Sequence, residues 1–469
     1  MFLSVILLQY HSINTIVKAC FKKTSPLITL QTVSKQISIG QALFTEDYLL
    51  ELARNFGFAR RKPRKIGVCS LLASLCEECL QGSPSYNDLA AHIEANHDCA
   101  PSRQAVGLRL NKSFENLLQH LLEVVIAQKL SRSTLNGPPE LQFRGYRRVL
   151  VQDSTIIKLP SNLFTVFSGV SNAQSSVCNA RIQATYDLLS SRLINFSIDP
   201  YSKNDLATAP QLPIQEGDLV LRDRGYLLID EFQRHRDAGA NCIYRHKSAT
   251  LYLDPQTLQP IDLPALLKSR GKLDIEVLLN NCAHTPVRLV AAPVDEETAN
   301  LRRMRAKKQS CGHAPSKALL ELMDWTIFIT TIPSDAATLE EILAIYSLRW
   351  RIEVIFKAWK SHMKFGVLHR VSMQQLSILL KVRLLMIATC ANILYSSFER
   401  SLRQLYGRRL SLLKFMNYLS KNPLNFIRAL RSLPIIMSKN QAFHKTLLNY
   451  CCYDKRKRQN YSEIWDNLA

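Results

Sequence analysis

Four residues close to position 350 carry groups that bind metal ions and phosphates. They are a phenol, a guanidinium, a carboxylate and an ammonium, at successive spacings of three, four and seven residues: Tyr346, Arg349, Glu353 and Lys360. The run IYSLRWRIEVIFKAWK around them lacks Pro and Gly and predicts a helix. At about 100° per residue the four side chains fall within roughly 60° of arc, so they share one helical face. On such a face the carboxylate can hold a divalent cation while the basic groups hold phosphates.

Two aspartates upstream of this helix lie in or after apolar strands. Asp153 follows Val149–Val151, and a β-branched run continues beyond it to Ile157. Asp223 comes just after the short apolar stretch Leu219–Leu221. A carboxylate inside an apolar strand is costly to bury unless a positive group meets it. Taken alone, each aspartate is more typical of a strand end or turn than of a metal site. A single Glu among Lys and Arg residues is likewise more typical of a solvated helix.

The spacing Tyr-x2-Arg-x3-Glu-x6-Lys, with its Arg-Trp-x-Ile-Glu context, resembles the signature of one branch of bacterial insertion-sequence transposases of the DDE class. That branch cuts and pastes DNA through hairpin ends. The resemblance implies a catalytic and metal-binding set that holds two Mg²⁺ ions, with Mn²⁺ as a substitute: Asp153, Asp223 and Glu353. It also implies a set that binds phosphates of the terminal nucleotides: Tyr346, Arg349 and Lys360.

The strand pattern between the two aspartates agrees with the α/β fold that the resemblance implies. Two further strands are expected at Arg181–Leu189 and Leu193–Asp199, separated by a Ser-Ser turn. The order of three strands, then helix, strand, helix, strand and helix is that of a ribonuclease-H-like core. Asp223 and Glu353 are 353 − 223 = 130 residues apart, too far for the uninterrupted fold. An insertion is therefore expected at 246–322, where Ile275–Leu279 and Val287–Ala292 predict strands.

Trp325 has two interpretations. It lies 346 − 325 = 21 residues before Tyr346, where the hairpin-forming relatives carry a Trp that stacks on a flipped DNA base. An aromatic face can offset the few kcal/mol that unstacking a base costs. Alternatively, Trp325 is a core residue that shares one face of a strand with Ile327 and Ile329.

The N-terminal region contains a candidate DNA-reading segment. Ser85–Leu110 has the pattern of a helix-turn-helix, in which Ser102 would cap the second helix. Three polar side chains on that helix are candidates for contacts with DNA: Arg103, Gln104 and Arg109. An ordinary helical hairpin explains the pattern equally well.

Composition points to a polyanionic partner. The 469 residues include 60 Lys and Arg against 38 Asp and Glu, a formal net charge of +22. The basic residues are spread along the chain and no run of about 20 uncharged apolar residues occurs, so a membrane partner is not expected. The resemblance to insertion-sequence transposases implies that this partner is DNA, at the inverted ends of the element and at the target, and that the location is the bacterial cytoplasm near the nucleoid.

These features predict five parts along the chain. Residues 1–145 form a helical, basic DNA-binding region, and 146–245 the first part of the ribonuclease-H-like core. Residues 246–322 form a β-rich insertion, 323–375 the second part of the core with its catalytic helix, and 376–469 a helical C-terminal region. The last region either supports a homodimer across paired DNA ends or caps the core.

The function that follows is a DNA transposase that cuts at the ends of its own insertion sequence and joins the 3′ ends to target DNA. Two alternatives remain: a catalytically inactive, transposase-derived DNA-binding regulator, and a metal-dependent nuclease that never joins strands. Product analysis separates them, because only a transposase yields joined strands.

Overall fold

The fold is known from a computed structural model, which describes most of the chain after residue 43. The described residues are 44–59, 66–97, 99–127, 143–169, 177–203, 206, 212–310, 314–422, 441–454, 464 and 468. Parts of the regions expected at 1–145 and 376–469 therefore lie outside the described residues.

One mixed sheet of nine strands forms the centre of the described structure, in the order β3-β2-β1-β4-β5-β9-β8-β7-β6. Its first half consists of β1 (Arg148–Lys158), β2 (Asn179–Asp187), β3 (Arg192–Pro200), β4 (Asp218–Arg222) and β5 (Asn241–Arg245). The first three strands are antiparallel neighbours, whereas β4 and β5 run parallel to β1. The strands expected from the sequence are confirmed within a few residues of their predicted bounds.

The strands of the 246–322 segment extend the same sheet. They are β6 (Tyr252–Leu253), β7 (Leu273–Leu279) and β8 (Pro286–Pro293), and β8 pairs with β9 (Trp325–Thr330), which in turn pairs with β5. The two strands predicted in this segment are confirmed. The expectation of a β-rich segment is incomplete, because its described residues also form α11 (Leu263–Arg270), α12 (Glu296–Gln309) and α13 (Lys317–Leu322).

Alternate residues of the central strands enter two different cores. In β4, Leu219 and Leu221 belong to one buried cluster and Val220 to the other. This alternation follows from the two-residue repeat of a strand and shows that both faces of the sheet are covered. The larger core lies against the long helices, and α10 (Asp230–Asp237) packs on the other face through Phe232.

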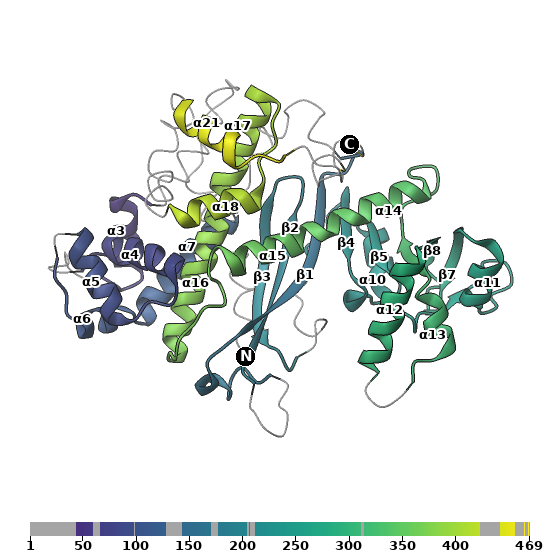
Figure 1. Cartoon of the computed structure of the whole chain (residues 1–469), viewed down its shortest axis with the longest axis horizontal. Helices are drawn as coiled ribbons and strands as arrows, with labels where there is room; N and C mark the ends of the chain where they lie inside the picture. Colours follow the sequence, from purple (N-terminus) through teal and green to yellow (C-terminus); the bar gives the residue numbers. More distant parts are fainter. Residues whose placement is uncertain are drawn as a thin grey trace.

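The helix predicted around position 350 is present but is divided by one tight turn. It comprises α14 (Leu339–Ser347), a 3₁₀ turn at Leu348–Trp350 and α15 (Arg351–Ser361), which together cross the sheet in Figure 1. Thr338 begins α14 with a capping box: the Thr338 hydroxyl accepts from the Glu341 backbone N–H, and the Glu341 carboxylate accepts from the Thr338 backbone N–H. The apolar residues on the other sides of this segment are buried: Ile345, Leu348, Ile352, Ile355, Phe356 and Trp359.

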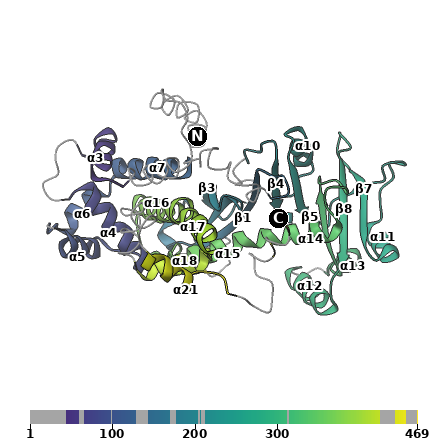
Figure 2. The same cartoon turned by 90° about the horizontal axis from the view of Figure 1, so that it is seen from above.

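The N-terminal helices pack on one long C-terminal helix rather than forming a detached unit. They are α3 (Glu46–Asn55), α4 (Val68–Gln81), α5 (Tyr86–Asn96), α6 (Arg103–Arg109) and α7 (Lys112–Ala127). Helix α16 (Met373–Thr389) lies between this group and the sheet in Figures 1 and 2. It continues through a π-helical segment, Cys390–Tyr395, into α17 (Ser396–Tyr406), and α18 (Leu412–Lys421) and α21 (Gln441–Tyr450) follow.

The continuous helix Met373–Arg403 is long and apolar enough to cross a membrane by composition alone, but 89% of its apolar window is buried inside the protein. Its burial among α4, α7 and β3 is that of a core helix. In the described structure α16 therefore packs as part of the core, whereas the role in a homodimer stays a prediction.

Candidate active site

Two strands and one helix bring the three expected carboxylates together where β4 ends beside the middle of β1. Gln152 of β1 lies opposite Arg222 of β4, so Asp153 and Asp223 are the next residues of two neighbouring parallel strands. Glu353 lies in the first turn of α15, which packs against β1. Asp153 is held in place by its own strand, because its Oδ1 accepts a hydrogen bond of 2.8 Å from the Ser154 backbone N–H.

Arg349 connects two of these carboxylates directly. Its Nη1 donates to Asp153 Oδ2 at 2.9 Å, and its Nη2 donates to Glu353 Oε1 at 2.6 Å. Only 11% of the Arg349 side chain is exposed, against 21% for Asp153 and 35% for Glu353. Arg349 lies in the 3₁₀ turn, which departs from the ideal α-helical spacing assumed for the sequence motif.

Tyr346 connects the third carboxylate. Its hydroxyl donates to the Arg222 carbonyl oxygen at 3.3 Å and to Asp223 Oδ1 at 3.4 Å. The ring packs against Phe328 with 4.1 Å between centroids, and the Arg349 guanidinium lies 5.7 Å from the Tyr346 ring centroid. Residues of the sequence motif thus tie Asp153, Asp223 and Glu353 into one connected group.

The electrostatics of the group are those of crowded carboxylates with a cation between them. Burial raises the pKa of Asp153 to about 6; Arg349 and the Ser154 N–H oppose this rise, while the charges of Glu353 and Asp223 add to it. Burial also raises the pKa of Tyr346 above its usual range, so this phenol remains a hydrogen-bond donor at neutral pH. Burial alone would lower the pKa of Arg349, but the surrounding anionic groups hold it above its usual value.

The donor set fits a hard divalent cation, although its present arrangement does not. Three carboxylates offer the oxygen ligands that Mg²⁺ prefers. Within the described residues, however, no three His, Cys, Asp or Glu side chains stand in positions to share an ion. The Arg349 guanidinium, placed between Asp153 and Glu353, occupies the oxygens that a cation would need.

Lys360 lies on the same helix but outside this group. It is exposed in the last turn of α15, two turns beyond Glu353, and partial burial lowers its pKa. In the described structure the ion pairs of Asp153 and Glu353 are made by Arg349 and not by Lys360.

Trp325 begins β9 and is half-buried. Its side chain packs against the second core, which also contains Ile327 and Ile329, as expected for residues on one strand face. Arg302 of α12 donates to the Trp325 carbonyl oxygen at 2.9 Å and to Thr326 Oγ1 at 3.1 Å. The structure thus gives Trp325 a core contact and leaves part of its indole accessible.

The three N-terminal candidates lie on α6, away from the carboxylates. Ser102 caps this helix as predicted, because its hydroxyl accepts from the Ala105 backbone N–H. Arg103 and Gln104 are exposed. Arg109 is different: its guanidinium donates to the Phe58 and Ile66 carbonyl oxygens and lies 3.8 Å from the Phe58 ring centroid. These contacts explain Arg109 as a structural residue, so the expectation that it reads DNA is not supported by its position.

Two residues near the three carboxylates were not singled out from the sequence. Arg245 ends β5 one step beyond Tyr244, which pairs with Arg222, so it lies beside Asp223, and its charge acts on Tyr346. Trp350 is 62% exposed in the 3₁₀ turn next to Arg349. The sequence signal for Arg245 was its place at the end of a parallel strand, where functional residues of α/β sheets gather.

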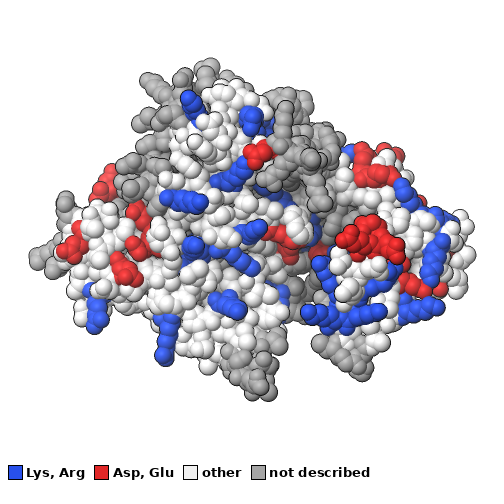
Figure 3. Space-filling model, viewed as in Figure 1, with Lys and Arg blue, Asp and Glu red and all other residues white. Residues whose placement is uncertain are grey.

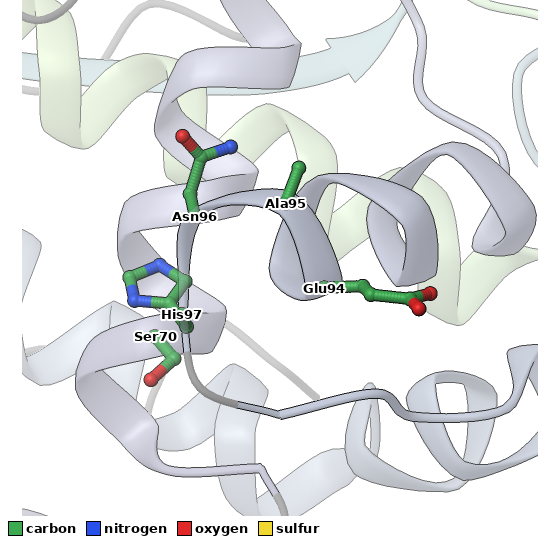
Figure 4. Close-up of a pocket in the computed structure, with 5 residues that line it drawn as sticks. All are labelled: Ser70, Glu94, Ala95, Asn96 and His97. Carbon is green, nitrogen blue, oxygen red and sulfur yellow. The ribbon is translucent and has the colours of Figure 1, made fainter.

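Basic side chains are spread over one face of the molecule, and its hollow lies away from the three carboxylates. Lys and Arg side chains are spread over the face shown in Figure 3, and the part that carries α12 shows both an acidic patch and basic side chains around it. Helix α12 itself begins with Glu296 and Glu297 and ends with Lys307 and Lys308. A shallow hollow lined by Ser70, Glu94, Ala95, Asn96 and His97 lies instead on the N-terminal helices (Figure 4). It holds one carboxylate and no cluster of catalytic groups.

Comparisons with known proteins relate this site to one family. Residues 145–393, just over half of the chain, match the family described as transposase DDE domain, a span that includes all three carboxylates. The transposase of insertion sequence IS231E from Bacillus thuringiensis subsp. finitimus is 26% identical over 376 residues, which cover 75% of this chain and 78% of that protein. The transposase of IS1151 from Clostridium perfringens is 24% identical over 78% of this chain and 81% of that protein.

A solved structure is also similar in outline. It is the cryo-EM structure of a piggyBac transposase synaptic complex with hairpin DNA, with 10% identity and a TM-score of 0.43 over 91% of this chain and 87% of that one.

Proposed function

This chain belongs to the transposase DDE-domain family, and from that premise we propose that Asp153, Asp223 and Glu353 are its catalytic carboxylates. The protein is a DNA transposase of the insertion-sequence type. The observation that carries the proposal is the connection of the three carboxylates through Arg349 and Tyr346, two residues of the same sequence motif.

The proposed catalytic core is ribonuclease-H-like. The strand order β3-β2-β1-β4-β5, with three antiparallel strands followed by two parallel to β1, supports this assignment. Residues 1–145 would supply a DNA-binding region, 246–322 an insertion between the two parts of the core, and 376–469 a C-terminal region that takes part in a homodimer on DNA.

Asp153, Asp223 and Glu353 would hold two Mg²⁺ ions, which Mn²⁺ can replace. When bound, such ions activate the attacking water or hydroxyl and stabilise the leaving oxygen. The side chains of this protein act around them: Arg349 and Lys360 neutralise phosphate charge, and the Tyr346 hydroxyl donates a hydrogen bond while keeping the end of β4 in place.

The proposed reaction proceeds by successive phosphoryl transfers on DNA. Water attacks a phosphodiester at the end of the element and releases a 3′-hydroxyl. This hydroxyl attacks the opposite strand, so that a hairpin forms and flanking DNA leaves; a second water reopens the hairpin. The freed 3′-hydroxyl finally attacks target DNA. Partly exposed Trp325 is the proposed stacking surface for a base displaced at the hairpin, and Arg103 and Gln104 are proposed contacts to the terminal repeat.

DNA is the proposed partner at both the terminal repeats and the target, and the bacterial cytoplasm near the nucleoid is the proposed location. The net charge of +22 favours binding to a polyanion. The regulator and nuclease alternatives predict, respectively, no cleavage and cleavage without joined strands.

The test uses duplex DNA that carries the inverted ends flanking this gene. Wild-type protein and Glu353→Gln are incubated with it, with and without Mg²⁺, and the products are separated on a denaturing gel. We expect metal-dependent nicks and hairpins with the wild type and none with the variant, while mobility shifts show equal binding. Glu340→Gln is the matched control, because Glu340 is an exposed residue of α14 that pairs only with Lys272 at 3.1 Å in the described structure.

Cleavage by Glu353→Gln at the wild-type rate would refute the catalytic assignment. End binding by the wild type without any product, even in Mn²⁺, would favour the regulator.

A further inference from the structure

Arg349 makes contacts in this structure that are incompatible with its proposed role on DNA. Its two terminal nitrogens face Asp153 Oδ2 and Glu353 Oε1, and its side chain is nearly enclosed. A guanidinium has five N–H donors in its plane, of which these carboxylates use two, and the Nε–H is buried without a partner in the described structure. With only 11% of the side chain exposed, a phosphate cannot reach the remaining donors while the group stays in this place. The residue therefore has one set of partners without DNA and another with it.

The contacts of Arg349 also compete with a metal ion. A divalent cation bound by Asp153 and Glu353 would need the oxygens that now accept from Arg349. It would also bring two positive charges to a place that already holds one. Conversely, without either cation, three carboxylates would face one another at close range, which is unfavourable.

We propose that Arg349 is an internal cation that fills the carboxylate group of the DNA-free protein, and that a DNA phosphate draws it away and so opens the site to Mg²⁺. This inference rests on the proposed function, because it takes the three carboxylates as the metal ligands. It adds that DNA and metal bind cooperatively: the protein alone binds divalent ions weakly, and DNA strengthens their binding.

Thermodynamic linkage sets the expected size of this effect. If DNA raises the affinity for the ion, the ion must raise the affinity for DNA by the same factor, and such couplings are typically between about 5-fold and 150-fold. Because a full ion pair is exchanged here, we expect a change of about tenfold or more. A protein without the Arg349 guanidinium should lose this coupling and bind the ion more tightly in the absence of DNA.

Electron paramagnetic resonance of Mn²⁺ tests this directly, because free and bound ions give different signals and no turnover is needed. The full-length protein is titrated with Mn²⁺ with and without duplex terminal DNA, as wild type, Arg349→Gln, Arg349→Lys and Glu353→Gln. Glu353→Gln with DNA supplies the background of ions held by DNA phosphates alone. Arg305→Gln, on the exposed face of α12, is the matched control for loss of one positive charge.

The expected result has three parts. DNA raises the Mn²⁺ affinity of the wild type about tenfold or more, Arg349→Gln binds Mn²⁺ at least as tightly without DNA as the wild type does with it, and Arg305→Gln resembles the wild type. Arg349→Lys keeps the charge but cannot bridge two carboxylates, so its coupling should be intermediate; this variant replaces Arg349→Gln if circular dichroism shows that the latter is unfolded.

Equal Mn²⁺ affinity of wild type and folded Arg349 variants without DNA would overturn the inference while leaving the proposed function intact. A different result separates the two: if Glu353→Gln binds Mn²⁺ as tightly as the wild type does when DNA is present, the carboxylates are not the ligands and the proposed function itself fails.

Discussion

At the scale of single residues, Trp350 and Trp325 differ in how far solvent reaches their side chains. Trp350 is 62% exposed beside Arg349, whereas Trp325 is half-buried and packs against the second core. A base can stack only on an aromatic face that solvent reaches, and each such contact contributes about 1–3 kcal/mol. The exposed position therefore makes Trp350 a second candidate for contact with an unpaired base.

Replacing each tryptophan by Ala should separate packing from DNA contact. Trp350→Ala is expected to weaken binding to terminal DNA with unpaired end bases by about 1–3 kcal/mol and to leave the free energy of unfolding almost unchanged. Trp325→Ala is expected to lower that free energy by about 2 kcal/mol, because it removes apolar contacts from a core. Fluorescence anisotropy and urea denaturation measure the two quantities; unchanged DNA affinity in Trp350→Ala would contradict the first expectation.

Arg245 provides a second prediction at this scale. It ends β5 beside Asp223 and acts electrostatically on Tyr346, so a phosphate at the carboxylates would lie within its field. Arg245→Gln should weaken DNA binding and reduce the slope of log affinity against log salt by about 1. Binding measured at several salt concentrations checks this, with the exposed Arg270→Gln at the end of α11 as control. An unchanged slope would exclude a phosphate contact.

At the scale of elements, hydrogen bonds from Arg222 hold the end of β4, just before Asp223, against α10 and β5. The Arg222 guanidinium donates to Glu231 Oε2 at 3.3 Å on α10 and to the Tyr244 hydroxyl at 3.1 Å on β5. His235, fully buried on α10, lies 3.1 Å from the same hydroxyl through Nε2. This buried polar network joins β4, β5 and α10 immediately before Asp223, the proposed catalytic aspartate.

The network should make stability depend on pH. Burial, together with the charges of Arg222 and Arg234, lowers the pKa of His235 to about 3. In the unfolded chain a histidine has a pKa near 6.5, so the unfolded state takes up a proton first and stability falls as pH drops from about 6.5 toward 3. Between pH 7 and pH 5 the contribution of His235 to this loss should be about 2 kcal/mol, while the raised pKa of Asp153 acts in the opposite direction.

Urea denaturation at both pH values measures this loss. His235→Gln should be less stable than the wild type at pH 7 but should show a smaller change between the two pH values. The exposed His284→Asn is the control and should keep the wild-type difference. If His235→Gln keeps the full difference, the pH dependence has another source.

The elements also show how far sequence reasoning reaches. The strands around Asp153 and the buried residues of the 339–361 helix were predictable, because apolar periodicity reports burial directly. The 3₁₀ turn at Leu348–Trp350 was not, since no Gly or Pro marks it and the turn depends on tertiary packing. The types of the site residues were predictable, but the bridge that Arg349 makes depends on side-chain conformations that only the assembled sheet and helix define. Arg109 shows the same limit, because a surface-like sequence position proved to be a contact with Phe58.

At the scale of the whole molecule, the N-terminal helices and α16 form one body held by buried polar contacts. Glu115 of α7 accepts from Lys381 Nζ at 2.6 Å and from Ser377 Oγ at 2.5 Å, both on α16. Asn392 pairs with Leu193 of β3 in both directions and donates to the Val125 carbonyl oxygen of α7. These contacts tie the region with the candidate DNA-reading helix to the sheet that carries the carboxylates.

Breaking the first of these contacts should destabilise the whole protein. Only 8% of the Glu115 side chain and 20% of the Lys381 side chain are exposed, so Glu115→Gln leaves a positive charge without its partner at low exposure. The expected loss is about 3 kcal/mol of unfolding free energy, measured by urea denaturation. Glu123→Gln, on the same helix with only a side-chain amide partner, should change it by less than about 0.5 kcal/mol. Equal effects of the two substitutions would contradict a stabilising role for the Glu115 pair.

The continuity of the nine-stranded sheet has a mechanical consequence. Backbone hydrogen bonds connect the outer hairpin β7-β8 through β9, β5 and β4 to the strand that carries Asp153. A plate joined in this way has no hinge between its outer strands and its centre. A duplex that contacts both the β7-β8 hairpin and the strand with Asp153 therefore has to bend and twist to fit their fixed separation. Its affinity then depends on how easily its sequence deforms.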